Sequence, residues 1–304
     1  MGGYLAEARC TIDLMVADDS LVPDQTKWFH TWREAKEFLG SLEGHYVFRG
    51  MGNAEWLLLT TLNRAVKYRA AEAEQVLIKT FPKALSENIP DQPPCGDHVS
   101  WLALMRHYGL PSRLLDCTES HIVAAYFAAQ TRSDRHLAIW AIQKDGVQRA
   151  AEAALGIVGE PLSPAELGSS ELFSTAFLAP KRFVALVDAQ HKTDRQQAQK
   201  GLFLCPGDPG ELFWRNIVPE IRHRPGFLYR VVLPPDARQA IEKDLSGTDV
   251  NRADLLPDTH HLERLCVTLA TLLKESQEPY GHFQWKLQVL PVLMVHGRLE
   301  VEVS

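Results

Sequence analysis

The hydrophobic and polar positions of the chain follow two different periods, and this pattern predicts both strands and helices. Short apolar runs predict strands at residues 10–16, 46–48, 137–142, 184–187, 201–205 and 228–233. Helical spacing predicts helices at residues 31–42, 70–88, 99–108, 235–245 and 258–276, and a further helix that begins after Ser120. Because these elements alternate without regular strand–helix–strand units, we expect an α+β fold with a mainly antiparallel sheet and flanking helices.

Local signals mark several of the helix ends. Thr31 and Glu34 have the spacing of a capping box, which begins a helix. Pro82 is expected to kink or end the helix at 70–88, because proline lacks an amide hydrogen. Gly109 is expected to stop the helix at 99–108 in the left-handed conformation, and Pro111 prevents its continuation.

The domain organisation follows from the same pattern. We expect one domain over residues 1–278, with residues 279–304 as a β-hairpin extension of it. The hairpin prediction rests on residues 283–303, which alternate in polarity around a turn at His296-Gly297. Residues 150–173 are poorly patterned, so we interpret them as an insertion or a mobile loop.

Composition and charge exclude several classes of protein. The longest apolar stretch lies near residues 289–295. It is much shorter than the roughly 18 residues of a membrane span, so no membrane association is expected. The five cysteines form no CxxC pair, and the first ten residues lack the order of a signal peptide, so we expect a cytoplasmic protein without a zinc site. The formal net charge of -6 argues against a protein that coats duplex DNA.

Three charged motifs stand in otherwise apolar surroundings. The first is Arg49, which ends an apolar strand and precedes Gly50. The second covers residues 106–116 and brings two arginines, a histidine and an aspartate around a tight bend. The third covers residues 195–203 and leads into a predicted strand. Taken one at a time, each motif fits a structural network of ion pairs about as well as a ligand site.

Taken together and in this order, the motifs strongly resemble the FRG domain family, which is named for its Phe/Tyr-Arg-Gly motif. The residues that carry the resemblance are Phe48-Arg49-Gly50, Trp56, His107 through Asp116, Tyr126-Phe127-Ala128 and Arg195 through Phe203. It extends over roughly residues 30–275. Cys117 stands where the family usually has a tryptophan, and Ser112 keeps the hydroxyl group of the usual threonine.

The order of the motifs also resembles, more weakly, the core of ADP-ribosyltransferases. This resemblance implies that Arg49 holds the phosphate and ribose of NAD, and that residues 116–118 with 123–128 support the pocket. It also implies a late glutamate that polarises the oxocarbenium ion, but Gly201 stands at that position. Since glycine carries no charge, we expect Asp116 to stabilise the positive charge and Gln199 to orient the ribose hydroxyls.

The resemblances imply a single nucleotide-shaped pocket. Its expected catalytic residues are Arg49, Asp116 and Gln199. Its expected ligand-binding residues are Gly50, His107, Tyr108, Arg113, Thr118 and Arg195. The expected cofactor is NAD and no metal is expected. The leading hypothesis is that the protein binds NAD or a related nucleotide and either cleaves it or transfers ADP-ribose, with a protein or RNA as the target.

Two other hypotheses use the same residues. In the first, the protein is a sensor that recognises a nucleotide or an RNA end without turnover. In the second, Arg49 and Asp116 form a buried structural pair, and the C-terminal hairpin provides an interface for a partner protein.

Overall fold

A computed structural model describes residues 25–65, 70–84, 92–94, 96–107, 109–131, 133–179, 181–190 and 199–246 of the protein. The strand expected at 10–16, the helix expected at 258–276 and the hairpin expected at 283–303 lie outside the described residues. No helix in the described part is long and apolar enough to cross a membrane.

The described strands form one seven-stranded sheet in the order β1-β7-β4-β2-β3-β6-β5. Its strands are β1 (Thr26–Trp28), β2 (Tyr46–Met51), β3 (Leu115–Thr118), β4 (Leu137–Gln143), β5 (Val184–Val187), β6 (Gly201–Pro206) and β7 (Leu228–Leu233). β1 pairs with β7 in parallel, and the other neighbouring strands are antiparallel. The expectation of an α+β fold with a mainly antiparallel sheet is therefore confirmed, while β1 and β3 were not predicted as strands.

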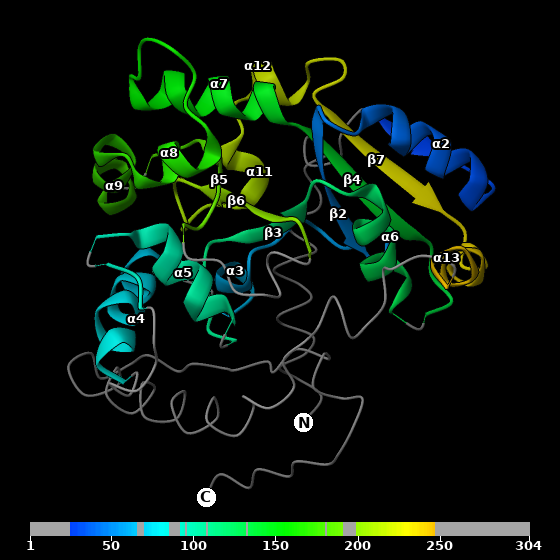
Figure 1. Cartoon of the computed structure of the whole chain (residues 1–304), viewed down its shortest axis with the longest axis horizontal. Coiled ribbons are helices and arrows are strands. Elements are labelled where there is room, and N and C mark those ends of the chain that lie inside the picture. Colours follow the sequence, from blue (N-terminus) through cyan, green and yellow to red (C-terminus); the bar gives the residue numbers. More distant parts are fainter. Residues whose placement is uncertain are drawn as a thin grey trace, which may run out of the picture.

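The sheet is weakly joined between β2 and β3. β2 pairs with β4 along its whole length, from Tyr46↔Gln143 to Met51↔Ala138, but with β3 at the single pair Phe48↔Thr118. Past that pair the two strands separate, and Figure 1 shows β3, β5 and β6 turned away from β2, β4 and β7. We call this place the β2–β3 split. Arg49 follows Phe48 directly on β2, so it lies where the split begins.

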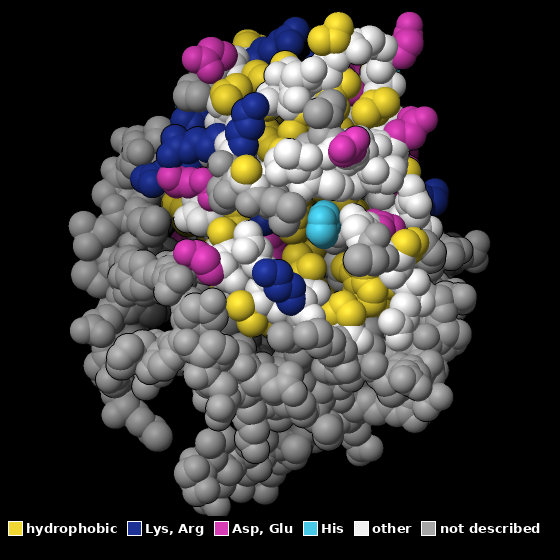
Figure 2. Space-filling view, turned by 90° about the vertical axis from the view of Figure 1, so that its left-hand side faces the viewer, with side chains coloured by type: hydrophobic (Ala, Val, Ile, Leu, Met, Phe, Trp, Pro, Cys, Tyr) yellow, Lys and Arg dark blue, Asp and Glu magenta, His cyan; other side chains and the backbone are white. Residues whose placement is uncertain are grey.

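Helices surround both parts of the sheet. They are α2 (Trp32–Leu42), α3 (Thr61–Ala65), α4 (Ala70–Ala84), α5 (His98–His107), α6 (His121–Ala129), α7 (Lys144–Leu155), α8 (Pro164–Ser169), α9 (Glu171–Leu178), α11 (Phe213–Asn216), α12 (Pro219–Arg222) and α13 (Ala237–Leu245). Figure 1 shows α6 lying across β2 and β4, with α2 and α13 on the same side. Figure 2 looks onto the side where α4, α8 and α9 lie, and Lys and Arg side chains gather in one corner of this surface with acidic side chains among them.

Side chains alternate across the strands, so each face of the sheet has its own apolar cluster. On one face Phe48 and Val231 pack with α2, α6 and α13, and we call it the α6 face. On the other face Val47, Ile142 and Leu228 pack with Trp214 of α11, and we call it the α11 face. A third cluster joins α4, α5, α8 and α9 to β5 and β6.

The local capping signals are confirmed. Thr31 accepts a hydrogen bond from the backbone of Glu34 and forms a full capping box at the start of α2. Ser120 caps α6 by accepting from the backbone of Val123. Gly109 adopts φ +80° two residues after the end of α5 (His98–His107), as the left-handed stop requires. Pro82 lies inside α4 (Ala70–Ala84), and residues 85–88 of the expected helix lie outside the described residues.

The interpretation of residues 150–173 as an insertion or a mobile loop is wrong. This stretch contains the second half of α7, all of α8 and the beginning of α9. Ser163 and Glu166 form a capping box around Pro164 at the start of α8, and Ser170 caps α9. α8 and α9, with 6 and 8 residues, are too short to give a clear hydrophobic period, which explains why the apolar pattern did not predict these two helices.

Candidate functional site

Arg49 points into the α11 face beside the β2–β3 split. Its Nη1 donates a hydrogen bond to the backbone carbonyl of Asp116 over 2.6 Å and lies 3.5 Å from the Asp116 carboxylate. The side chain is 17% exposed, and its buried Nε has no hydrogen-bond partner. Burial lowers the pKa of Arg49 from its ordinary value to about 10. The guanidinium is thus only partly satisfied by the protein, although some of it reaches solvent.

Asp116 lies on β3, across the split from β2. The side chain of Arg106, in the last turn of α5, donates to both carboxylate oxygens of Asp116. Arg106 also donates to the hydroxyl of Thr61 over 3.2 Å, which ties α5 to α3. The Asp116 side chain remains 43% exposed. A bidentate pair of this kind fixes the orientation of the carboxylate, so Asp116 is held in one position while its outer side stays accessible.

The charge of Arg49 acts on a further cation, Arg64, near the end of α3. The pKa of Arg64 is lowered first by burial and then by the charge of Arg49. Burial also raises the pKa of the Cys117 thiol, so this cysteine stays protonated at neutral pH. At the split, two guanidinium groups, those of Arg49 and Arg106, lie at the carboxylate of Asp116.

Thr118 and Gln199 meet at the other end of β3. The Thr118 hydroxyl donates to the backbone carbonyl of Gln199 over 2.7 Å and accepts from the backbone nitrogen of Ser120 over 3.1 Å. Lys200 follows with φ +46°, a left-handed conformation that is uncommon for a residue with a side chain. This turn brings Gln199 and Lys200 of the third motif next to the second. The expected contact between the two motifs thus runs through the backbone of Gln199.

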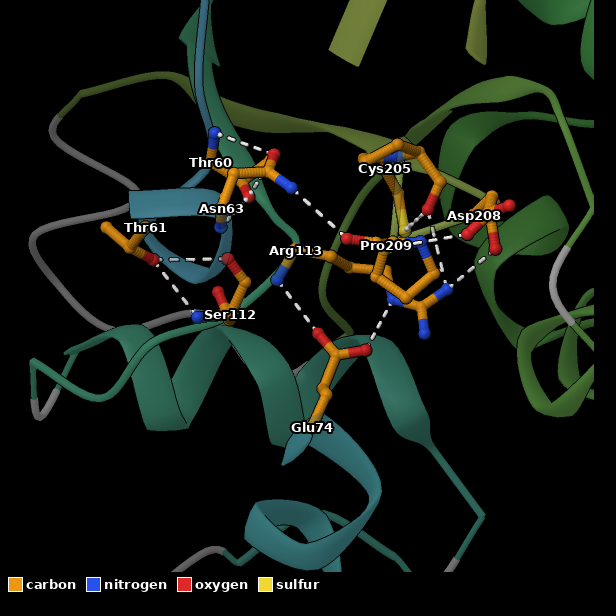
Figure 3. Close-up of polar contacts among 12 residues, drawn as sticks. Thr60, Thr61, Asn63, Glu74, Ser112, Arg113, Cys205, Asp208 and Pro209 are labelled. Carbon is orange, nitrogen blue, oxygen red and sulfur yellow. Dashed lines mark hydrogen bonds and ion pairs between the residues drawn. The ribbon is translucent and has the colours of Figure 1, made fainter. Parts of the chain in front are cut away.

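Arg113 does not join this group. Its side chain is 2% exposed, and its Nε lies 2.5 Å from the Glu74 carboxylate, which is fully buried. The same carboxylate accepts from the backbone nitrogen of Arg113 over 2.8 Å, as Figure 3 shows, and the guanidinium also donates to the carbonyl of Gly207. It stacks on the ring of Phe177 at 4.0 Å. Arg113 is therefore fully engaged in joining α4 to the end of β6, and its buried guanidinium has a structural role.

Gly50 also has a structural explanation. A Cβ atom at this position would lie 1.8 Å from the backbone oxygen of Ala124 and 2.8 Å from the nitrogen of Ala128. Both belong to α6, so the missing side chain lets this helix approach β2. The close approach of α6 is enough to explain a glycine at this position, without the expected approach of a ligand to the backbone.

The remaining expected residues divide into two groups. His107 is the last residue of α5, next to Arg106 and half-buried. Tyr108 and Arg195 lie outside the described residues. The structure thus brings Arg49 and Asp116 together, with Thr118 and the Gln199 backbone at the far end of the same strand, and places Arg113 elsewhere.

Three residues at the split were not among the expected site residues. Arg106 was visible as part of the second motif, directly before His107, and a second arginine near Asp116 was the available signal. Thr61 and Arg64 lie on the short helix α3, where no motif marks them. As Figure 3 shows, Thr61 also exchanges hydrogen bonds with the backbone of Ser112, which fixes α3 against the chain before β3.

These features define an α+β protein with an arginine-rich site at a divided sheet. Residues 44–136 match the family model of the FRG domain, so this part of the chain is an FRG domain. It contains β2 and β3, hence both sides of the split, whereas the third motif at 195–203 lies outside the match. No curated protein and no solved structure matches the chain.

Proposed function

We propose that the FRG domain binds a nucleotide of the NAD class at the β2–β3 split. The observation that carries the proposal is the incomplete pairing of Arg49. A buried guanidinium is normally satisfied by carboxylates or carbonyls on every side, because an unmet donor costs free energy. Arg49 has one carbonyl, a more distant carboxylate and an unused Nε. A phosphate group supplies the acceptors that a guanidinium lacks.

The charge balance of the site supports an anionic ligand. Arg106 engages both oxygens of Asp116, so this carboxylate is largely neutralised before it can compensate Arg49 or Arg64. The site therefore keeps a net positive charge. A diphosphate carries enough negative charge to balance two guanidinium groups.

The accessible side of Asp116 supports a sugar near the phosphate. Each carboxylate oxygen has lone pairs beyond those that Arg106 uses, and the side chain is 43% exposed. Ribose hydroxyls are suitable donors to such oxygens. The weak resemblance to ADP-ribosyltransferases, in which an arginine holds NAD, supports NAD as the member of this class to test first.

The same geometry favours binding over cleavage. Departure of nicotinamide leaves positive charge on the ribose, which needs a nearby negative charge. Asp116 is shared with Arg106, and Gly201 stands where a transferase has glutamate. A sensor that binds without turnover is thus the form of the proposal that the charges favour, with cleavage or transfer of ADP-ribose as the second form.

Calorimetric titration with NAD tests the proposal. The wild type is compared with Arg49→Met and with Arg182→Met, a control in which an exposed arginine paired with Glu211 is removed. A charge-assisted hydrogen bond contributes about 1.5–3 kcal/mol, so Arg49→Met should weaken binding at least about tenfold while Arg182→Met does not. Equal affinity of the wild type and Arg49→Met, or no binding at all, contradicts the proposal.

A second readout separates the two forms. Nicotinamide release is followed during incubation of the wild type and Asp116→Asn with NAD. Binding without release supports the sensor. Release by the wild type that Asp116→Asn abolishes supports cleavage, with Asp116 stabilising the ribose cation.

A further inference from the structure

A polar row crosses the middle of the α11 face. In the strand register Arg49 of β2 is opposite Trp140 of β4, and Trp140 is opposite Arg230 of β7. Residues that are opposite each other share a face, so these three side chains lie side by side across three strands. The pairs on both sides of the row are apolar, namely Val47, Ile142 and Leu228 on one side and Met51, Ala138 and Val232 on the other.

The row has unused hydrogen-bond donors. The Nε atoms of Arg49 and Arg230 and the Nε1 atom of Trp140 are buried and have no hydrogen-bond partner. The indole of Trp214, whose ring centroid lies 5.2 Å from that of Trp140, has an unpartnered Nε1 as well. Trp140 is 3% exposed and Trp214 2%, so solvent does not satisfy these groups. Buried donors are rarely left without acceptors, so a gathering of them needs an explanation.

Arg230 is the most unusual member of the row. Its guanidinium lies over the ring of Trp140, 5.8 Å from the centroid, and burial lowers the pKa of Arg230. Among the residues that the structure describes, no carboxylate forms an ion pair with it. A purely structural arginine in an apolar face would be expected to have such a partner, as Arg113 has in Glu74.

We propose that Arg230, together with Trp140 and Arg49, forms a subsite for an oxyanion of the phosphoryl class. Every unused group in the row is an N–H donor, and two of the three residues carry positive charge. A tetrahedral oxyanion offers acceptors in several directions and the negative charge that the row lacks. This assigns a function to a residue that lies outside the FRG match at 44–136.

The row fits an anion better than an aromatic ring. Arg230 covers Trp140 from one direction and Trp214 packs against it at an interplanar angle of 48°. Trp140 is 3% exposed, so its indole offers no free surface on which a base or nicotinamide could stack. The guanidinium groups at the two ends remain partly accessible, since Arg230 is half-buried and the Arg49 side chain is 17% exposed.

The proposal does not need NAD as the ligand, because any phosphoryl group satisfies it. Since Arg49 belongs both to the row and to the split, the ligand's phosphoryl group is expected to lie on the α11 side of Arg49. A nucleotide and free phosphate both offer this chemistry, and the experiment distinguishes them.

The test measures the melting temperature of the protein during titration with inorganic phosphate at constant ionic strength, with chloride as the reference anion. The wild type should show a saturable rise. Arg230→Met should weaken the apparent phosphate affinity about tenfold, and the control Arg182→Met should match the wild type. Without phosphate, Arg230→Met should melt at the same or a higher temperature, because an uncompensated charge has been removed.

A structural role for Arg230 predicts the opposite. If the arginine only clamps Trp140 through a cation–π contact, Arg230→Met melts at a lower temperature and binds phosphate like the wild type, which overturns the proposal. No phosphate response of the wild type also overturns it. If Arg230→Met does not fold, the same titration is done with Arg230→Lys, which keeps the positive charge but loses the planar guanidinium group. A phosphate affinity of Arg230→Lys equal to that of the wild type then contradicts the subsite.

Titration with AMP and with NAD on the same variants identifies the source of the phosphoryl group. Tighter binding of either nucleotide than of phosphate, lost in Arg230→Met, supports a nucleotide phosphoryl group in the row. Phosphate binding that depends on Arg230 without any NAD binding leaves the subsite standing and rejects the proposed function alone.

Discussion

Two arginines of the FRG motifs illustrate how the surroundings of a residue decide its role. Arg113 is enclosed by a carboxylate, two backbone carbonyls and an aromatic ring. Arg49 has one carbonyl at hydrogen-bond distance and a buried nitrogen without a partner. Both residues are conspicuous charges in the sequence. Arg113 has a buried counter-charge in Glu74, whereas Arg49 has too few hydrogen-bond acceptors for its guanidinium donors. This difference is the reason for assigning the ligand to Arg49.

Replacing Arg49 should not weaken the fold. Because burial lowers the pKa of Arg49 to about 10, the folded protein holds this proton less tightly than the unfolded chain does. The charged form therefore costs stability at every pH below about 10, and the cost declines as the pH rises from about 10 towards the ordinary pKa of arginine. We expect Arg49→Met to raise the free energy of unfolding in urea by about 1–3 kcal/mol at pH 7. A loss of more than about 1 kcal/mol would indicate the structural Arg49–Asp116 pair instead.

Removing the partner of Arg113 should have a large effect. Glu74→Ala leaves a buried guanidinium without its carboxylate, and breaking a buried pair from one side typically costs about 3–5 kcal/mol. The double variant Glu74→Leu/Arg113→Met removes both charges and should recover most of that loss. Urea unfolding of the two variants measures the difference. A cost below about 1 kcal/mol for Glu74→Ala would show that the pair contributes little.

The sequence predicted the roles of individual residues unevenly. Arg49 was identified because it ends an apolar strand, which is a local signal, whereas Asp116 was identified as one of the charged residues of the second motif, around a tight bend. The pairing of Arg113 was missed because its partner, Glu74, is one of two glutamates on an amphipathic helix and nothing local marks it as buried. Arg230 carried a comparable signal, since it is a charge inside the predicted apolar strand at 228–233, and it could have been singled out on that ground.

At the scale of elements, the contact of α6 with β2 positions the site. α6 crosses β2 at Gly50, where its backbone approaches so closely that no side chain fits. Gly50 directly follows Arg49, so this contact fixes the end of β2 from which the guanidinium extends. Helix starts were predicted well because capping depends on neighbouring residues, as at Thr31 and Ser120. The signal at Ser163-Pro164 was also present but belongs to a helix of six residues, too short for a hydrophobic period.

A methyl group at Gly50 should disturb this contact. Gly50→Ala places Cβ 1.8 Å from the Ala124 carbonyl oxygen, so α6 must move away from β2. We expect a loss of at least about 2 kcal/mol in the free energy of unfolding, as for overpacked core positions. Gly40→Ala is the matched control, because this glycine is at an exposed position of α2 and its Cβ would meet only the ring of His121 at 3.8 Å. Alanine should stabilise this helix by about 0.5–1 kcal/mol. Equal stability of the two variants would contradict the close packing of α6.

At the scale of the whole molecule, the divided sheet creates the site. The strands β1, β7, β4 and β2 and the strands β3, β6 and β5 meet at the single pair Phe48↔Thr118, and the charged groups gather where the two parts diverge. The sequence predicted the fold class, since the order of elements is enough for that. It did not predict the split or the pairing of β1 with β7, because both depend on long-range register that no local pattern encodes.

The most direct test of the account is a crystal structure of the protein soaked with NAD. We expect difference density at the β2–β3 split, with a phosphoryl group contacting Arg49 from the α11 side, close to Trp140 and Arg230, and a ribose hydroxyl near Asp116. Density for NAD elsewhere on the protein, with Arg49 and Arg230 contacting no part of it, would contradict the central claim.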